Sequence, residues 1–175
     1  SPVAHAAIGG ISIPEVYRGR VLVADDIAFT RPIVANGAAP SFRCSEYPAL
    51  AKGKVRFVGE MIAACVAPTR AEAEDMAQAC SVDLEELAVV WDMDVAFSGD
   101  APMIHDGWPA NDFLTTEISA GDLERARAQA SFTVKRKLRM GRHVGVPLET
   151  RGVIAHFDRR LDELEAGVAD RWHPG

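Results

Sequence analysis

The chain has 175 residues, of which 48% are hydrophobic and 25% charged, a composition typical of a globular protein with a core of useful size. Its formal net charge is −6, and its densest basic cluster, residues 135–139, is typical of one face of a strand, so binding to nucleic acid is disfavoured. No apolar run approaches the ~20 residues that a membrane span needs, and we expect no signal peptide. The three widely spaced cysteines favour reduced, buried thiols in a cytoplasmic protein.

Short strands are predicted in the first third of the chain. Residues 6–13 are an apolar segment interrupted by two glycines, which is typical of a strand with a bulge or turn. A second apolar run, residues 20–27, ends in acidic turn residues. Residues 28–53 contain several prolines and glycines and predict a long irregular excursion, a kind of loop that is often functional.

A strand pair is predicted next. Residues 54–58 and 61–67 read as two strands joined at Gly59 and Glu60. The second strand is apolar throughout, so we expect both of its faces to be buried.

A helix over about 70–80 follows these strands. Thr69 and Glu72 have the spacing of a capping box, in which the threonine hydroxyl accepts a hydrogen bond from the third helical N–H group. Helical spacing then predicts a buried face. That face consists of Ala73, Met76, Ala77 and Cys80.

The second half of the chain predicts one more helix and three more strands. Residues 81–87 alternate like a half-exposed strand, and residues 98–119 read as loop. A helix is expected to start near Asp122, followed by a long edge or paired strand at 131–141 and a last strand at 149–158. The inner face of this helix is expected to be Leu123, Ala126 and Ala130. The pattern predicts an α+β fold, with a mixed sheet and two main helices packed on one side.

The residues alone reveal no self-contained site. The sequence has no glycine-rich phosphate loop, zinc-protease motif, nucleophile elbow or paired-cysteine motif. The five histidines lack the close spacing of metal ligands, so no metal site is predicted.

The order of several segments resembles a known family. Residues 1–13, SPVAHAAIGGISI, resemble a strand with the sequence serine-proline-histidine-alanine-histidine-alanine, in which Val3 replaces the first histidine and His5 matches the second. Residues 54–96 are similar to a strand–helix–strand unit of the same family, with Met61 in place of the commoner proline.

Two further segments continue the resemblance. Residues 101–111, APMIHDGWPAN, resemble a segment that carries leucine-valine-histidine, and residues 121–158 are similar to a helix followed by a long strand. The family is that of the large, molybdenum-bearing subunits of xanthine dehydrogenase, aldehyde oxidase and CO dehydrogenase.

The resemblance implies an α/β-hammerhead domain over residues 1–158. In the family this domain packs against larger domains that hold molybdopterin, often as the cytosine dinucleotide, and electrons pass to iron–sulfur and flavin subunits. Residues 159–175 depart from the family pattern, and we expect a divergent, partly disordered tail. The spacing of Leu161, Leu164 and Val168 would also permit a short helix there.

The resemblance also implies candidate site residues. In the family, a glutamine just before a Leu-Glu-Thr segment hydrogen-bonds an oxo ligand of molybdenum, and that place falls here on His143, or on Arg142 if the register shifts by one. Glu60 and Glu149 are candidates for a substrate funnel. The alternatives are a polar strand entrance for His143, a hydrogen-bonding turn residue for Glu60, and a same-face strand pair with Arg151 for Glu149. His5 and His105 match family positions and are expected to be structural.

Three interpretations follow. The chain is the hammerhead part of a molybdopterin-dependent hydroxylase, inactive alone and binding no cofactor by itself, completed by a molybdenum-domain polypeptide. Alternatively it is a non-catalytic assembly or partner-binding module, or a truncated remnant. In each case a surface that the parent subunit would cover is exposed, and we expect Phe113, Leu114 or residues 144–147 to promote a homo-oligomer.

Overall fold

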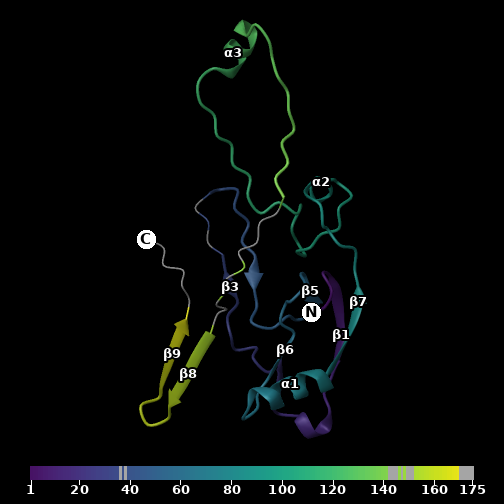
Figure 1. Ribbon diagram of the computed structural model, residues 1–175, viewed down its shortest axis with the longest axis vertical. Helices are drawn as coiled ribbons and strands as arrows, with labels where there is room; N and C mark the ends of the chain where they lie inside the picture. Colours follow the sequence, from purple (N-terminus) through teal and green to yellow (C-terminus); the bar gives the residue numbers. More distant parts are fainter. Residues whose placement is uncertain (36, 38, 142–145, 147, 149–151, 170–175) are drawn as a thin grey trace. The chain divides into compact units, whose positions relative to one another are not determined.

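The computed structural model describes residues 1–35, 37, 39–141, 146, 148 and 152–169 (Figure 1). The chain divides into two compact units, Ser1–Ser119 and Ala120–Gly175, and each unit is described by itself.

The first unit is organised by a three-stranded antiparallel sheet. Its central strand is β1 (Ala6–Ser12), which pairs with β5 (Lys54–Val55) on one side and with β7 (Ser81–Glu86) on the other. The register with β7 shifts between Ile8 and Gly10, so the bulge predicted at the two glycines is confirmed. A Cβ atom on Gly9 would lie 2.7 Å from Asp83 Oδ2, so a side chain there would require the exposed Asp83 carboxylate to shift.

The core of this unit lies on that sheet. Its fully buried residues are Ala6, Ala51, Val55 and Ile62, and the half-buried residues packed against them are Val3, Ile8, Ile11, Val82 and Leu84. The alternation predicted for residues 81–87 is therefore confirmed, because Val82 and Leu84 face the core and their neighbours face solvent.

The predicted strand pair at 54–58 and 61–67 is wrong in its pairing. The first strand, β5, pairs with β1, whereas the second, β6 (Ala63–Cys65), pairs with β2 (Val21–Val23). The expectation that both faces of 61–67 are buried is also wrong, since β6 is half-buried and Met61 and Val66 are exposed. β6 belongs to a two-stranded ribbon that lies against one short helix, which covers only part of its apolar surface.

That helix is α1 (Arg70–Ala79), and it begins where the sequence predicted. The Thr69 hydroxyl accepts a hydrogen bond from the Glu72 N–H group at 3.3 Å, as expected for an N-cap. Met76 is fully buried, and Ala73 and Cys80 are half-buried. Ala77 is exposed, so the buried face is narrower than predicted.

The remainder of the first unit is mostly loop. The described residues between 28 and 53 are irregular as predicted, apart from the two-residue strands β3 (Ile33–Val34) and β4 (Glu46–Tyr47), which pair with each other. The short helices η1 (Glu15–Tyr17) and α2 (Met93–Ala96) were not predicted. Residues 98–119 contain no helix or strand, which confirms the predicted loop.

The second unit contains α3 (Leu123–Gln129). Its N-cap is Asp122, whose carboxylate accepts a hydrogen bond from the Arg125 N–H group at 2.9 Å, so the predicted start is confirmed. The predicted inner face is wrong for this chain, because Leu123, Ala126 and Ala130 are all exposed.

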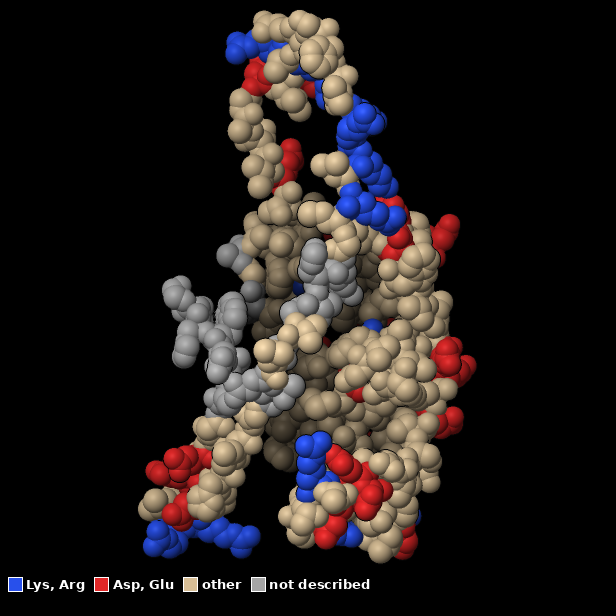
Figure 2. Space-filling model, viewed as in Figure 1, with Lys and Arg blue, Asp and Glu red and all other residues tan. Residues whose placement is uncertain are grey.

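The strand predicted at 131–141 is absent. The segment has no assigned strand partner within the described part of the chain, and an extended segment becomes a strand only when a neighbour satisfies its backbone groups. Its side chains are exposed, and Figure 2 shows the cationic ones as a blue stretch over residues 135–139.

A β-hairpin follows in the second unit. Strands β8 (Gly152–Asp158) and β9 (Glu163–Ala169) pair antiparallel along their whole length, through a turn in which Asp162 has a φ of 54°. The last predicted strand is thus confirmed for residues 152–158. The short helix that the spacing of Leu161 and Leu164 permitted does not form, because residues 163–169 pair with β8 instead.

The α+β class is confirmed, but the predicted sheet is not. Every described strand pair is antiparallel, and the strands divide among four small sheets rather than one mixed sheet with two helices on one side. Among the described residues, no helix is long and apolar enough to cross a membrane.

The buried thioether of Met76 provides a test of this packing. Met76→Ala should lower the free energy of unfolding by about 2–5 kcal/mol, because it removes a fully buried side chain and leaves a cavity. Met93→Ala is the matched control, since Met93 is 64% exposed and its loss should cost little. Urea denaturation of both variants measures the difference, and equal losses would contradict the assigned core.

Candidate functional site

Only one of the four predicted site residues is described by the structure. His143, Arg142 and Glu149 lie outside the described residues. Glu60 lies in the first unit, directly after the turn that leaves β5.

Glu60 is a buried carboxylate, with 4% of its surface exposed. It follows Gly59, whose φ of +87° places the backbone in a region that glycine adopts without strain. The carboxylate accepts a hydrogen bond from the Arg56 backbone N–H group, and the Arg56 Nη1 atom lies 4.0 Å from Glu60 Oε1. Glu60 thus holds the turn between residues 56 and 60.

Glu60 also lines a cavity of about 210 Å³. The other lining residues are Ser45, Glu46, Tyr47, Arg56, Phe57, Ile104 and His105. Within this wall the rings of Tyr47 and Phe57 stack, with centroids 5.9 Å apart. The cavity therefore combines an aromatic wall with a carboxylate, a guanidinium group and an imidazole.

His105 lines this cavity and also a second one of about 270 Å³. The second cavity is lined by Ser45, Val90, Ala96, Ile104, His105, Trp108, Asn111 and Phe113. The imidazole stacks on the Trp108 ring, with centroids 4.5 Å apart and planes at 28°. We call the two spaces together the His105 cavities.

The surroundings of His105 keep its imidazole neutral at neutral pH. Burial lowers the pKa of His105 first, and the positive charge of Arg56 lowers it further, while Asp106 and Glu60 oppose these effects. A neutral imidazole offers one N–H donor and one acceptor nitrogen. His105 is thus suited to hydrogen bonding inside the cavities.

The loop that carries His105 is fixed by Asn111. The Asn111 Oδ1 atom accepts a hydrogen bond from the Ile104 N–H group at 3.1 Å, and its Nδ2 atom donates to the Pro102 carbonyl at 2.9 Å. These two bonds close the segment 102–111 on itself.

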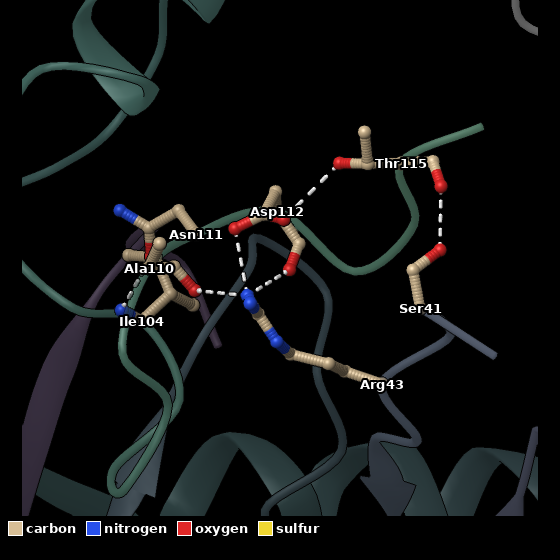
Figure 3. Close-up of polar contacts among 7 residues, drawn as sticks. All are labelled: Ser41, Arg43, Ile104, Ala110, Asn111, Asp112 and Thr115. Atoms are coloured by element: carbon tan, nitrogen blue, oxygen red, sulfur yellow. Dashed lines mark hydrogen bonds and ion pairs between the residues drawn. The ribbon is translucent and has the colours of Figure 1, made fainter. Parts of the chain in front are cut away.

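Arg43 ties this loop to the irregular excursion that precedes β4 (Figure 3). Its Nη1 atom donates to the Asp112 carbonyl and to Asp112 Oδ1, both at 2.7 Å, and the Arg43 N–H group donates to the Phe113 carbonyl at 2.7 Å. Nearby, the Ser41 hydroxyl donates to the Thr115 carbonyl. We call this set of contacts the Arg43 clamp.

The Arg43 clamp also changes the acidity of Asp112. The hydrogen bond from Arg43 holds the pKa of the Asp112 carboxyl below its usual range, and partial burial opposes this effect. Sequence reasoning missed Arg43, Asn111 and Asp112. Their partners are roughly 70 positions away or within an irregular loop, where no periodicity applies.

The remaining candidates have structural surroundings. His5 is buried, and its Nδ1 atom lies 2.8 Å from the Ala88 carbonyl, which agrees with the structural role expected for it. Trp108 is half-buried against His105, and Trp91 is 82% exposed. Phe113 and Leu114 are 57% and 39% exposed, as predicted.

The described residues do not fit a resident metal ion. No group of three or more His, Cys, Asp or Glu side chains among them could hold one. The described contacts around the His105 cavities are hydrogen bonds that position loops. They do not make up a set of catalytic groups.

Comparison with known proteins places these features in context. The sequence profile of the molybdopterin cofactor-binding domain matches residues 104–170. The nicotine 6-hydroxylase large subunit of Paenarthrobacter nicotinovorans is 34% identical over 174 residues, which cover 97% of this chain and 21% of that subunit.

Solved structures show the same likeness. Quinoline 2-oxidoreductase from Pseudomonas putida 86 matches with a TM-score of 0.86 and 32% identity, over 97% of this chain and 22% of that chain. Aldehyde oxidoreductase from Desulfovibrio gigas matches with a TM-score of 0.81 and 27% identity, over 95% of this chain and 19% of that chain. The chain therefore spans about a fifth of the length of each of these proteins.

The hydrogen bond to Glu60 leads to a first prediction for this site. Glu60→Ala should lower the free energy of unfolding by about 1–3 kcal/mol, because it leaves the Arg56 N–H group without its acceptor. Glu60→Gln retains an oxygen that can accept this bond and should lose less. Chemical denaturation measures both, with Glu117→Ala in an exposed loop as control. A loss for Glu60→Ala no larger than the control would contradict the role of the turn.

The Arg43 clamp leads to a second prediction, on pH dependence. Since the pKa of Asp112 is lower in the folded chain than in the unfolded one, its contribution to stability is present above the unfolded pKa of about 3.9 and is lost as the pH falls through the lower folded pKa. Asp112→Asn should therefore be less stable than the parent chain near pH 7. This difference should shrink below about pH 4.

Denaturant midpoints between neutral and acidic pH measure this difference. Asp100→Asn, at an exposed position, is the matched control and should show no comparable loss. A difference between Asp112→Asn and the parent chain that stays constant with pH would show that the clamp does not act through the charge of Asp112.

Proposed function

We propose that this chain is the α/β-hammerhead part of the large subunit of a molybdopterin-dependent hydroxylase. Its sequence and structural neighbours are in the xanthine oxidase, aldehyde oxidoreductase and CO dehydrogenase family, among the molybdenum-binding large subunits. The observation that carries the proposal is the match to quinoline 2-oxidoreductase over 97% of this chain at a TM-score of 0.86. The enzyme so formed would be a cytoplasmic oxidoreductase.

In this proposal the chain is one part of a catalyst. The bound molybdopterin, as its cytosine dinucleotide, would supply the two-electron redox chemistry for hydroxylating a carbon atom with oxygen from water. Residues 104–170 match the molybdopterin cofactor-binding domain, and in the proposal the rest of the subunit, of which this chain would be about a fifth, supplies most of the contacts with the cofactor. His143 and Arg142 are the residues of this chain that we place nearest to it, and we assign Glu149 and Glu60 to the approach of the substrate.

Exposed apolar side chains support a role in docking. The second unit exposes large apolar residues on the extended segment that follows α3, and the first unit exposes several on its last loop. These residues are Phe113, Leu114, Ile118, Phe132, Val134, Leu138 and Met140. Apolar surface of this kind is typical of an interface that a partner covers. The proposed partner is the molybdenum-domain polypeptide, with iron–sulfur and flavin subunits completing the enzyme.

The same exposed residues favour a second candidate function. A non-catalytic assembly module would also dock through exposed apolar residues, yet it would not retain the cofactor. The two functions therefore differ in whether molybdenum accompanies the partner.

Molybdenum retention tests the proposal. The tagged chain, purified alone, should contain neither molybdenum nor pterin. Co-expressed with the nicotine 6-hydroxylase large subunit from which the matching fifth has been removed, it should co-purify with that polypeptide, molybdenum and pterin. Elemental analysis and pterin fluorescence measure both, and sedimentation of the chain alone reports whether it self-associates.

A matched pair of variants locates the interface. In an extended segment, neighbouring side chains point to opposite faces, so Phe132→Asp should reduce capture at least about tenfold by placing a charge in an apolar contact, whereas Thr133→Asp should not. Molybdenum bound by the chain alone would overturn the proposal. Capture of the polypeptide without molybdenum would favour the assembly module.

A further inference from the structure

The cavity that Glu60 lines has the chemistry of a ligand site. Its wall carries the Glu60 carboxylate, the Arg56 guanidinium group, an imidazole and two stacked aromatic rings. From this arrangement we infer that the cavity binds a small planar amide, that is, a carboxamide or a lactam, through Arg56 and Glu60. The inference can be tested on the chain alone and does not rest on the proposed function.

Arg56 and Glu60 carry charges that are incompletely hydrogen-bonded. Glu60 is 4% exposed, and its Oε2 atom accepts a hydrogen bond from the Arg56 backbone N–H group. The Arg56 Nη1 atom lies 4.0 Å from Glu60 Oε1, which is too far for a hydrogen bond. The buried Nε atom of Arg56 has no hydrogen-bond partner among the described residues. Because a buried charge is costly unless hydrogen bonds compensate it, the pair can still gain from a group that bonds to both.

An amide group matches the gap between these two side chains. Its carbonyl oxygen accepts a hydrogen bond, its N–H group donates one, and the oxygen and nitrogen lie about 2.2 Å apart. With hydrogen bonds of about 2.9 Å on each side, an amide spans the 4.0 Å between Arg56 Nη1 and Glu60 Oε1. The guanidinium group would donate to the carbonyl oxygen, and the carboxylate would accept from the N–H group.

The charges around the cavity favour a neutral ligand. The charges of Arg56 and Glu60 offset each other, and His105 is neutral near pH 7. Glu46 also lines the cavity, but it is exposed to solvent, which weakens its field. Glu60 would repel a carboxylate ligand, and Arg56 would repel a cationic one. A neutral amide avoids both repulsions and bonds to both charged groups.

The rest of the wall suits a single flat ring. The Tyr47 and Phe57 rings stack with their planes at 19°, and Ile104 adds an apolar side chain. The volume of about 210 Å³ is roughly that of seven water molecules in the liquid, so the cavity accepts one ring with an amide group rather than a drug-sized ligand. The Ile104 N–H group donates to Asn111 Oδ1, which fixes this part of the wall before any ligand binds (Figure 3).

Three probes of similar shape test the inference on the full chain. Benzamide, benzoate and benzamidinium carry a neutral, a negative and a positive group on the same ring. Calorimetric titration should show that benzamide binds saturably and about tenfold more tightly than either ion. The inference is overturned if benzamide binding does not saturate, or if either ion binds as tightly as benzamide.

Two variants that each remove one charge test the roles of the pair. Glu60→Gln should bind benzamide about tenfold more weakly and benzoate more tightly, because the repulsive carboxylate is gone. Arg56→Gln should likewise lose benzamide affinity, while its preference shifts towards benzamidinium. An equal loss for all three probes would show that these residues only maintain the fold, and would overturn their assignment to the ligand. Asp100→Asn, at an exposed position, is the control and should bind the probes like the parent chain.

The position of the site can be measured without any variant. On addition of benzamide to the parent chain, backbone amide chemical shifts should change at Arg56, Phe57 and His105, which line the cavity. This measurement stands even where a variant does not fold. Shift changes confined to other parts of the chain would overturn the inference.

Discussion

The pairing of β1 on both of its edges is the interaction on which the first unit depends. Through β5 and β7, this one strand joins segments that are roughly 50 and 75 positions away, and it places Ala6 and Val55 in the core. The turn that contains Glu60 follows β5, and α1 leads directly into β7. The sheet therefore determines where the turn of the buried carboxylate and the loop of His105 begin, although neither belongs to its three strands.

The hydrophobic core is small for a chain of this composition. The sequence has the hydrophobic content of an ordinary globular protein, yet the described structure buries few large apolar side chains completely and exposes many, including Phe132, Leu138 and Met140. Apolar residues that are exposed in this chain are suited to pack against the apolar surface of another domain. This mismatch between composition and burial agrees with the proposal that the chain is about a fifth of a larger subunit.

Outside the sheet, polar contacts hold the irregular segments in place. Glu60 closes its turn through the Arg56 N–H group, Asn111 closes the loop of His105, and Arg43 joins that loop to a distant segment. A few buried or half-buried hydrogen bonds thus hold long irregular segments that contribute little to a core. The His105 cavities lie between such segments, so their shape depends on these contacts.

The sequence alone determined the local elements, because their causes lie within a few residues. The Thr69 and Asp122 caps, the bulge at Gly9, the alternation of β7 and the α+β class follow from short-range hydrogen bonding and periodicity. Resemblance led to the same family that the comparisons support, and it singled out Glu60.

Only the tertiary structure decided which strands pair, since an apolar run does not specify its neighbour. β5 and β6 lie in different sheets, residues 131–141 have no strand partner among the described residues, and residues 163–169 pair with β8. The Arg43 clamp was likewise invisible in the sequence. It joins residues that only long-range packing brings together.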